Sequence, residues 1–71
     1  MSGLIKRSVT IAGHRTSVSL EPVFWDALVA AAEAEGRSVN ALVAEIDEAR
    51  TTNLSSAIRV WLFERLSPQA R

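Results

Sequence analysis

Residues 16–38 have the sequence TSVSLEPVFWDALVAAAEAEGRS, which predicts a strand, a helix and a turn in that order. Thr16 to Leu20 alternates polar and apolar side chains, the period of a strand with one buried face. Pro22 ends the strand and suits the first turn of a helix, where its missing N–H costs nothing. The Ala-rich segment Val23–Glu35 predicts that helix, and Gly36 is typical of the left-handed residue that ends one.

Two further helices are predicted downstream. Ser38 is a good N-cap for a helix whose apolar stripe is Val39, Leu42, Val43, Ile46 and Ala49. Asn53 or Thr52 can cap a third helix over Leu54–Leu66, which Pro68 ends before a short tail. The third helix carries one apolar stripe, Ile58, Trp61, Leu62 and Leu66, and two apolar residues outside it, Val60 and Phe63. So much apolar surface predicts burial between other elements or against a second subunit.

The segment before Thr16 leaves two interpretations open. Ser8–Ile11 also alternates polar and apolar residues, and Ala12–Arg15 contains Gly13, which tolerates a positive φ. An intramolecular hairpin and a single longer strand preceded by an arm both fit. A lone strand needs partners for its backbone groups, and the same strand of a twofold-related copy could supply them.

Length and composition predict one small globular domain. The chain has 71 residues, net charge 0, 48% hydrophobic residues and no cysteine. A chain of this size buries only about 60% of its unfolded surface, and no disulfide or thiolate metal site can compensate. We therefore expect an obligate homodimer. Because no signal sequence or membrane span is evident, we expect a cytoplasmic protein that does not enter a membrane.

The charge is unevenly distributed along the chain. Residues 1–20 hold three basic residues and no acid, residues 21–50 hold two basic and seven acidic residues, and residues 51–71 hold three basic and one acidic residue. The neutral total therefore conceals a basic N-terminal segment, which fits a local phosphate-binding feature. A solvated N-terminal tail explains the same charge pattern equally well.

The strand Thr16–Pro22, an apolar helix, Gly36-Arg37-Ser38 and a second apolar helix resemble the ribbon-helix-helix family of the Arc, MetJ and CopG type. The resemblance covers about Arg15 to Ala49. It implies a mainly α fold with a short β ribbon, a ribbon-helix-helix homodimer plus a third C-terminal helix, in a small bacterial protein. The chain then divides into 1–14, a basic arm or first strand of a hairpin, 15–50, the ribbon-helix-helix core, and 51–71, the C-terminal helix and tail.

The resemblance also implies which residues contact DNA. In this family two strands, one per subunit, form an antiparallel ribbon that enters the major groove of double-stranded DNA, and the start of the second helix binds a phosphate. The resemblance therefore implies that this protein reads the major groove with a dimeric β ribbon. Val18 and Leu20 then belong to the core face, and the base contacts are Arg15, Ser17 and Ser19. The phosphate contacts are Lys6, Arg7, Arg37, Ser38, Val39 and Asn40. An exposed ribbon face without a ligand is the alternative, and an intramolecular hairpin would widen or partly cover the ribbon.

The sequence thus predicts a sequence-specific DNA-binding transcriptional regulator, a repressor, and not an enzyme. It has one histidine, no cysteine and no evident catalytic carboxylate pair, so we expect no cofactor and no metal site. The alternative is a protein-interaction module of antitoxin type, or a small-effector sensor on the same fold. A protein partner would use the third helix, and an effector would contact His14.

Overall fold

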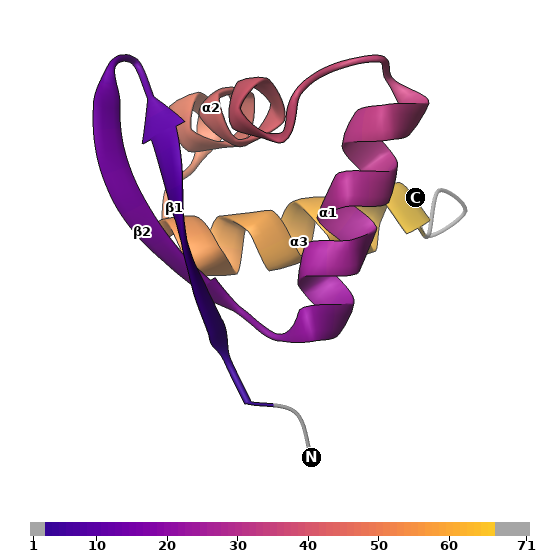
Figure 1. Ribbon diagram of the computed structural model, residues 1–71. Helices are drawn as coiled ribbons and strands as arrows, with labels where there is room; N and C mark the ends of the chain where they lie inside the picture. Colours follow the sequence, from indigo (N-terminus) through magenta and orange to yellow (C-terminus); the bar gives the residue numbers. More distant parts are fainter. Residues whose placement is uncertain (1–2, 67–71) are drawn as a thin grey trace.

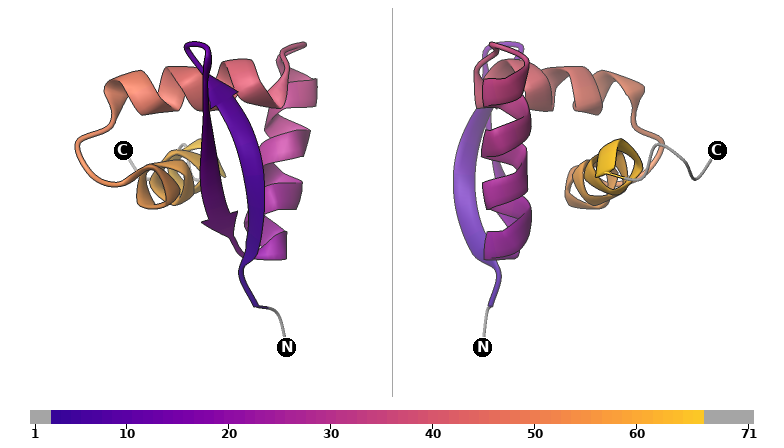
Figure 2. Two further views of the ribbon diagram at one scale, coloured as in Figure 1. Left: turned by 60° about the vertical axis from the view of Figure 1, so that its left-hand side comes forward. Right: turned by 90° about the vertical axis from the view of Figure 1, so that its right-hand side faces the viewer.

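The computed structural model describes residues 3–66 and shows a two-stranded hairpin followed by three helices (Figure 1). The hairpin and the helices form two sides of the molecule, with the hairpin lying across one side of the helical part (Figure 2). The elements are β1 (Ile5–Ile11), β2 (His14–Leu20), α1 (Pro22–Ala34), α2 (Val39–Ala49) and α3 (Leu54–Leu66). This is the mainly α fold with a short β ribbon that the sequence predicts.

β1 and β2 pair antiparallel within one chain, with Ile5 opposite Leu20 and Ile11 opposite His14. The loop has only two residues, Ala12 at φ 52° and Gly13 at φ 81°. Positive φ at both positions is the geometry of a tight hairpin turn whose twist matches that of the strands. The structure therefore contains the hairpin rather than a single strand with an arm, and both strands are longer than the alternating segments indicate.

The hairpin removes one reason for expecting a homodimer. The sequence argument assumed that the strand before α1 lacks a partner within its own chain. In the structure β1 supplies that partner along the full length of β2. The backbone groups of β2 that face β1 are thus satisfied without a second copy, whereas the other edge of β2 pairs with no strand among the described residues.

The predicted helix ends are confirmed. Gly36 has φ 66°, and the following N–H of Arg37 donates to the Ala32 carbonyl at 2.9 Å, which closes α1. The Ser38 hydroxyl caps α2 by accepting from the Ala41 N–H at 3.0 Å. Of the two candidate caps for α3, Asn53 serves, because its Oδ1 accepts from the Ser56 N–H at 2.8 Å. The predicted stop at Pro68 and the tail lie outside the described residues.

The core lies between the hairpin and the helices. Val9, Val18 and Leu20 contribute from the strands. The helices contribute Trp25, Leu28, Ala31, Ala32, Leu42, Val43, Ile46, Ile58 and Leu62. The Trp25 indole N–H donates to the Ile5 carbonyl at 2.8 Å, which ties the first turn of α1 to the start of β1. The hairpin is therefore anchored by apolar side chains on one face and leaves its other face to solvent.

α3 is less buried than its sequence indicates. Ile58 and Leu62 are fully buried, but Leu66, predicted on the same stripe, is 74% exposed because it lies at the end of the helix beyond the core. Val60 and Phe63 are 51% and 65% exposed. The chain's own described elements do not cover these side chains, so burial between its own elements is not the reason for their apolar character.

Replacing the α2 cap is expected to lower stability. Ser38→Ala removes the acceptor of the Ala41 N–H, and loss of such a cap costs about 1 kcal/mol. Urea denaturation followed by circular dichroism measures this change. Ser17→Ala, at an exposed strand position, is the control and should stay within about 0.5 kcal/mol of the parent. Equal effects of the two substitutions would contradict the capping role.

Candidate functional site

The hairpin has a core face and an outer face. Directly paired residues of antiparallel strands point to the same side, and successive residues alternate sides. Val9 and Val18 are buried, so their pairs lie on the core face. The outer face therefore holds the remaining pairs, which bring together Lys6, Ser8 and Thr10 from β1 with Arg15, Ser17 and Ser19 from β2.

The outer face carries positive charge and hydroxyl groups. Two of its six residues, Lys6 and Arg15, are basic, four are serine or threonine, and none is acidic. All are exposed except Ser19, which is half-buried. The predicted residues Arg15, Ser17 and Ser19 thus lie together on one face of the hairpin, because successive side chains of a strand point to alternate sides. β1 lies beside them and extends this face without covering it.

Sequence reasoning missed Ser8 and Thr10 as members of this face. They lie opposite Ser17 and Arg15 in the hairpin. The alternation of polar and apolar residues over 8–11 shows that Ser8 and Thr10 share one side of a strand. It shows which face of the ribbon they belong to only when the pairing of the two strands is known. The open choice between hairpin and arm therefore left these two hydroxyls unassigned.

Arg7 does not lie on the outer face. It is paired with the buried Val18, on the core side of the hairpin, and its guanidinium is 5.4 Å from the centre of the Trp25 ring. This separation is within the range of a cation–π contact. The structure therefore separates Arg7 from Lys6, although the sequence grouped both as phosphate contacts.

The start of α2 adjoins the turn end of the hairpin. Asn40 Oδ1 accepts from the Thr10 N–H at 3.3 Å, which joins β1 to the first turn of α2. Ser38 and Asn40 are exposed and Val39 is half-buried. Ser38 accepts from two N–H groups of this turn, those of Ala41 and Leu42. Among the described residues no acceptor meets the N–H groups of Val39 and Asn40, the arrangement in which a helix start can bind an anion.

Arg37 is held by acidic neighbours. Its Nη1 lies 2.5 Å from Glu45 Oε1 and 3.2 Å from Glu35 Oε1, and its Nη2 donates to the Ala41 carbonyl at 3.2 Å. The hydrogen bond to Glu45 and then that to Glu35 raise the pKa of Arg37 above its ordinary value. Two carboxylates thus surround this one guanidinium, so it adds little net positive charge to the start of α2.

His14 is exposed at the first position of β2, opposite Ile11. The groove between α1 and α3 and two smaller pockets beside α3 are lined by helix and loop residues and by none from the hairpin. These three cavities do not place His14 beside a ligand-sized space. Contact of His14 with a small effector stays a prediction.

The described part of the chain, residues 3–66, holds neither a metal-binding cluster nor a membrane-spanning helix. That part of the chain contains no group of three or more His, Asp or Glu side chains arranged to hold a metal ion. None of its helices is long and apolar enough to cross a membrane.

Comparison with known proteins supports the family resemblance. Residues 4–66 match the model of the ribbon-helix-helix domain, and the match spans both strands and all three helices. No curated protein and no solved structure matches the chain. Ribbon-helix-helix domains occur in DNA-binding transcription regulators and antitoxins, form dimers and are generally not enzymes. With a hairpin, capped helices and a family match over nearly its whole length, the chain belongs to the ribbon-helix-helix family.

Proposed function

We propose that this protein is a sequence-specific transcriptional regulator, a repressor, that acts in the cytoplasm as a homodimer on double-stranded DNA. The observation that carries this proposal is the outer face of the hairpin, where two basic and four hydroxyl side chains project from a rigid two-stranded ribbon. Opposite that face the same strands are anchored in the core by Val9, Val18 and Leu20. The ribbon thus has the chemistry and the support expected of a reading element.

The size of the hairpin suits the major groove. Each strand has seven residues, so the ribbon is about 23 Å long at the usual rise per strand residue. Its two strands lie about 5 Å apart, and the major groove is about 12 Å wide and accepts a two-stranded ribbon. Small hydroxyl side chains let the backbone approach the base edges closely. A bulky outer face would hold it away.

The outer-face residues divide into reading and positioning roles. The Arg15 guanidinium can donate two parallel hydrogen bonds to O6 and N7 of a guanine, the commonest specific contact in the major groove. Ser17 and Ser19 can donate to or accept from most bases. Lys6, near the opposite end of the ribbon, suits a phosphate at the groove edge.

The start of α2 supplies a second positioning contact. The N–H groups of Val39 and Asn40, with the Ser38 hydroxyl beside them, form an anion site at the positive end of the helix dipole. The Thr10–Asn40 hydrogen bond fixes this site next to the turn of the hairpin. A phosphate bound there would set the depth of the ribbon in the groove. Because Arg37 is already held by Glu35 and Glu45, the proposal gives it no part in this contact.

Selection from random double-stranded DNA, followed by affinity measurement at several salt concentrations, tests the proposal. We expect enrichment of one short motif. A dimer presents Lys6 and Arg15 twice, so about two to four phosphates are neutralised and the slope of log K against log salt should be about −2 to −4. No enriched sequence at low salt together with a slope near zero would refute DNA reading and favour a protein partner.

A further inference from the structure

The turn end of the hairpin lies beyond the core. None of the four residues in the two strand pairs next to the turn is fully buried, and Ile11 is the one that is half-buried. The buried strand side chains lie farther from the turn: Val9, Val18 and Leu20. Arg15, which is proposed to read a base, therefore lies on the part of the ribbon that the core supports least.

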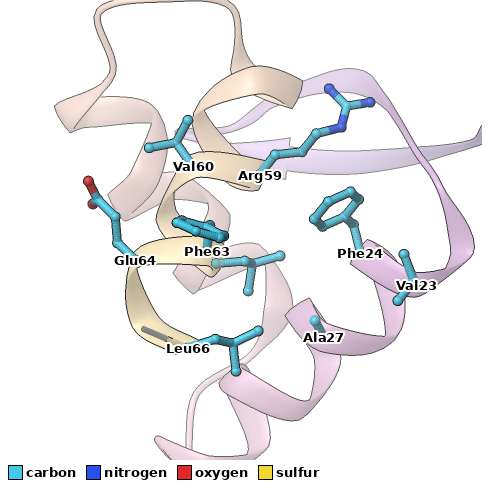
Figure 3. Close-up of a pocket in the computed structure, with 9 residues that line it drawn as sticks. Val23, Phe24, Ala27, Arg59, Val60, Phe63, Glu64 and Leu66 are labelled. Carbon is cyan, nitrogen blue, oxygen red and sulfur yellow. The ribbon is translucent and has the colours of Figure 1, made fainter. Parts of the chain in front are cut away.

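α2 is the helix that lies beside this part of β1. β1 packs mainly against α2, whereas α1 and α3 pack against β2 (Figure 1). α1 and α3 also enclose an apolar groove of about 530 Å³, which Figure 3 shows with Phe24 and Phe63 on its two sides. No strand residue lines that groove. The helix that can position the turn end of β1 is therefore α2.

A hydrogen bond joins α2 to the hairpin at the register of Arg15. Asn40 Oδ1 accepts from the Thr10 N–H at 3.3 Å, and Thr10 lies directly opposite Arg15. The pair next to a two-residue turn is hydrogen-bonded, and such pairs alternate along antiparallel strands, so the Thr10 N–H points away from β2. Asn40 meets it at the edge of the ribbon. Within residues 3–66 this is the only hydrogen bond between α2 and the hairpin.

We propose that Asn40 is a positioning residue for base reading, an inference that rests on the DNA-binding proposal. Its side chain fixes the Thr10–Arg15 pair against the first turn of α2, and so fixes where the Arg15 guanidinium meets a base edge. Two parallel hydrogen bonds to one guanine need such placement, because a bidentate contact forms only in a narrow geometry. The bond from the Trp25 indole N–H to the Ile5 carbonyl holds the other end of β1.

α2 does not need Asn40 in order to form. The Ser38 hydroxyl caps this helix by accepting from the Ala41 N–H at 3.0 Å. Alanine is a better helix former than asparagine, so Asn40→Ala does not weaken α2 itself. The bond to Thr10 is exposed, and its loss costs little stability. A change in base preference in this variant therefore reports the position of the hairpin and not its folding.

Three variants of the full chain test this inference. Asn40→Ala removes the acceptor, and Asn40→Asp keeps an oxygen in the same place. Asn53→Ala is the matched control, because the Asn53 side chain also accepts a backbone N–H, that of Ser56 at 2.8 Å, but at the start of α3. Amide hydrogen exchange without DNA should show Thr10 exchanging about two- to tenfold faster in Asn40→Ala. The other two variants should keep the parental rate at Thr10.

Binding to the selected duplex is then compared with binding to duplexes changed at the base pair whose preference Arg15→Ala removes. Asn40→Ala should lower this affinity ratio about threefold or more, as part of the roughly 5- to 150-fold discrimination that a bidentate contact gives. Asn40→Asp should weaken binding to every duplex alike, because its carboxylate repels phosphates, and should keep the ratio. Asn53→Ala should lower the melting temperature and also keep the ratio.

Four results would overturn the inference. They are an unchanged Thr10 exchange rate in Asn40→Ala, a base preference that this variant retains, and an equal loss of preference in Asn40→Asp or in Asn53→Ala. A parent that discriminates between bases while Asn40→Ala does so equally well would remove this inference alone. A selection that enriches no sequence would remove the DNA-binding proposal and this inference with it.

Discussion

Val18→Asp should abolish folding of this protein. The Val18 side chain is 2% exposed and points into the core opposite the helices. A carboxylate there would be buried among apolar side chains, and the paired Arg7 is itself exposed and lies against the Trp25 ring. Burying such a charge costs several kcal/mol, comparable with the whole stability of about 4–10 kcal/mol expected for 71 residues. Circular dichroism and thermal denaturation should show no cooperative transition.

Ser17→Asp is the matched control for this prediction. It places the same carboxylate one residue away on the same strand, but on the exposed outer face. It should fold with a melting temperature close to that of the parent, because a solvated charge has no burial penalty. Two variants with the same stability would mean that the two faces of the hairpin are assigned wrongly.

Arg15→Ala should weaken binding to the selected DNA sequence by about 1–3 kcal/mol, or roughly 5- to 150-fold. If Arg15 donates two hydrogen bonds to a guanine, its loss removes the preference for that base pair in each half-site. Fluorescence anisotropy with duplexes that differ at single positions measures both quantities. Because Arg15 is exposed, the melting temperature should stay unchanged.

Two other basic residues of the hairpin serve as controls for Arg15. Lys6→Ala should weaken binding to all sequences alike and reduce the salt slope, as expected for a phosphate contact. Arg7→Ala changes a residue on the core side, beside Trp25, and should leave the base preference intact. If Arg15→Ala lowers affinity equally for every sequence, Arg15 contacts phosphate and the reading role belongs elsewhere.

The local features of the fold could be predicted because each depends on near neighbours in sequence. The alternation of residues 16–20 placed Val18 and Leu20 in the core, and both are buried. Gly36 and Ser38 end one helix and begin the next through bonds that span only a few residues. Family membership followed from the same short elements and is confirmed by the family match.

The remaining features depend on contacts between distant residues. The choice between hairpin and arm is decided by the pairing of β1 with β2, which alternation alone does not encode. The position of Arg7 beside Trp25 follows from that pairing. Arg37 forms an ion pair with Glu45 because α2 places the Glu45 side chain beside the turn that precedes the helix. The sequence alone suggests that the Arg37 charge is free, whereas in the structure a carboxylate neutralises it.

The two-residue turn at Ala12-Gly13 has a consequence for how this protein would search for its sites. Because the turn joins both strands in one chain, a single copy that binds DNA as proposed would present all six outer-face residues by itself. A second copy then adds another face at a high effective concentration and does not have to finish the first. One chain could therefore scan DNA weakly, and long residence would arise only where two half-sites hold two chains together.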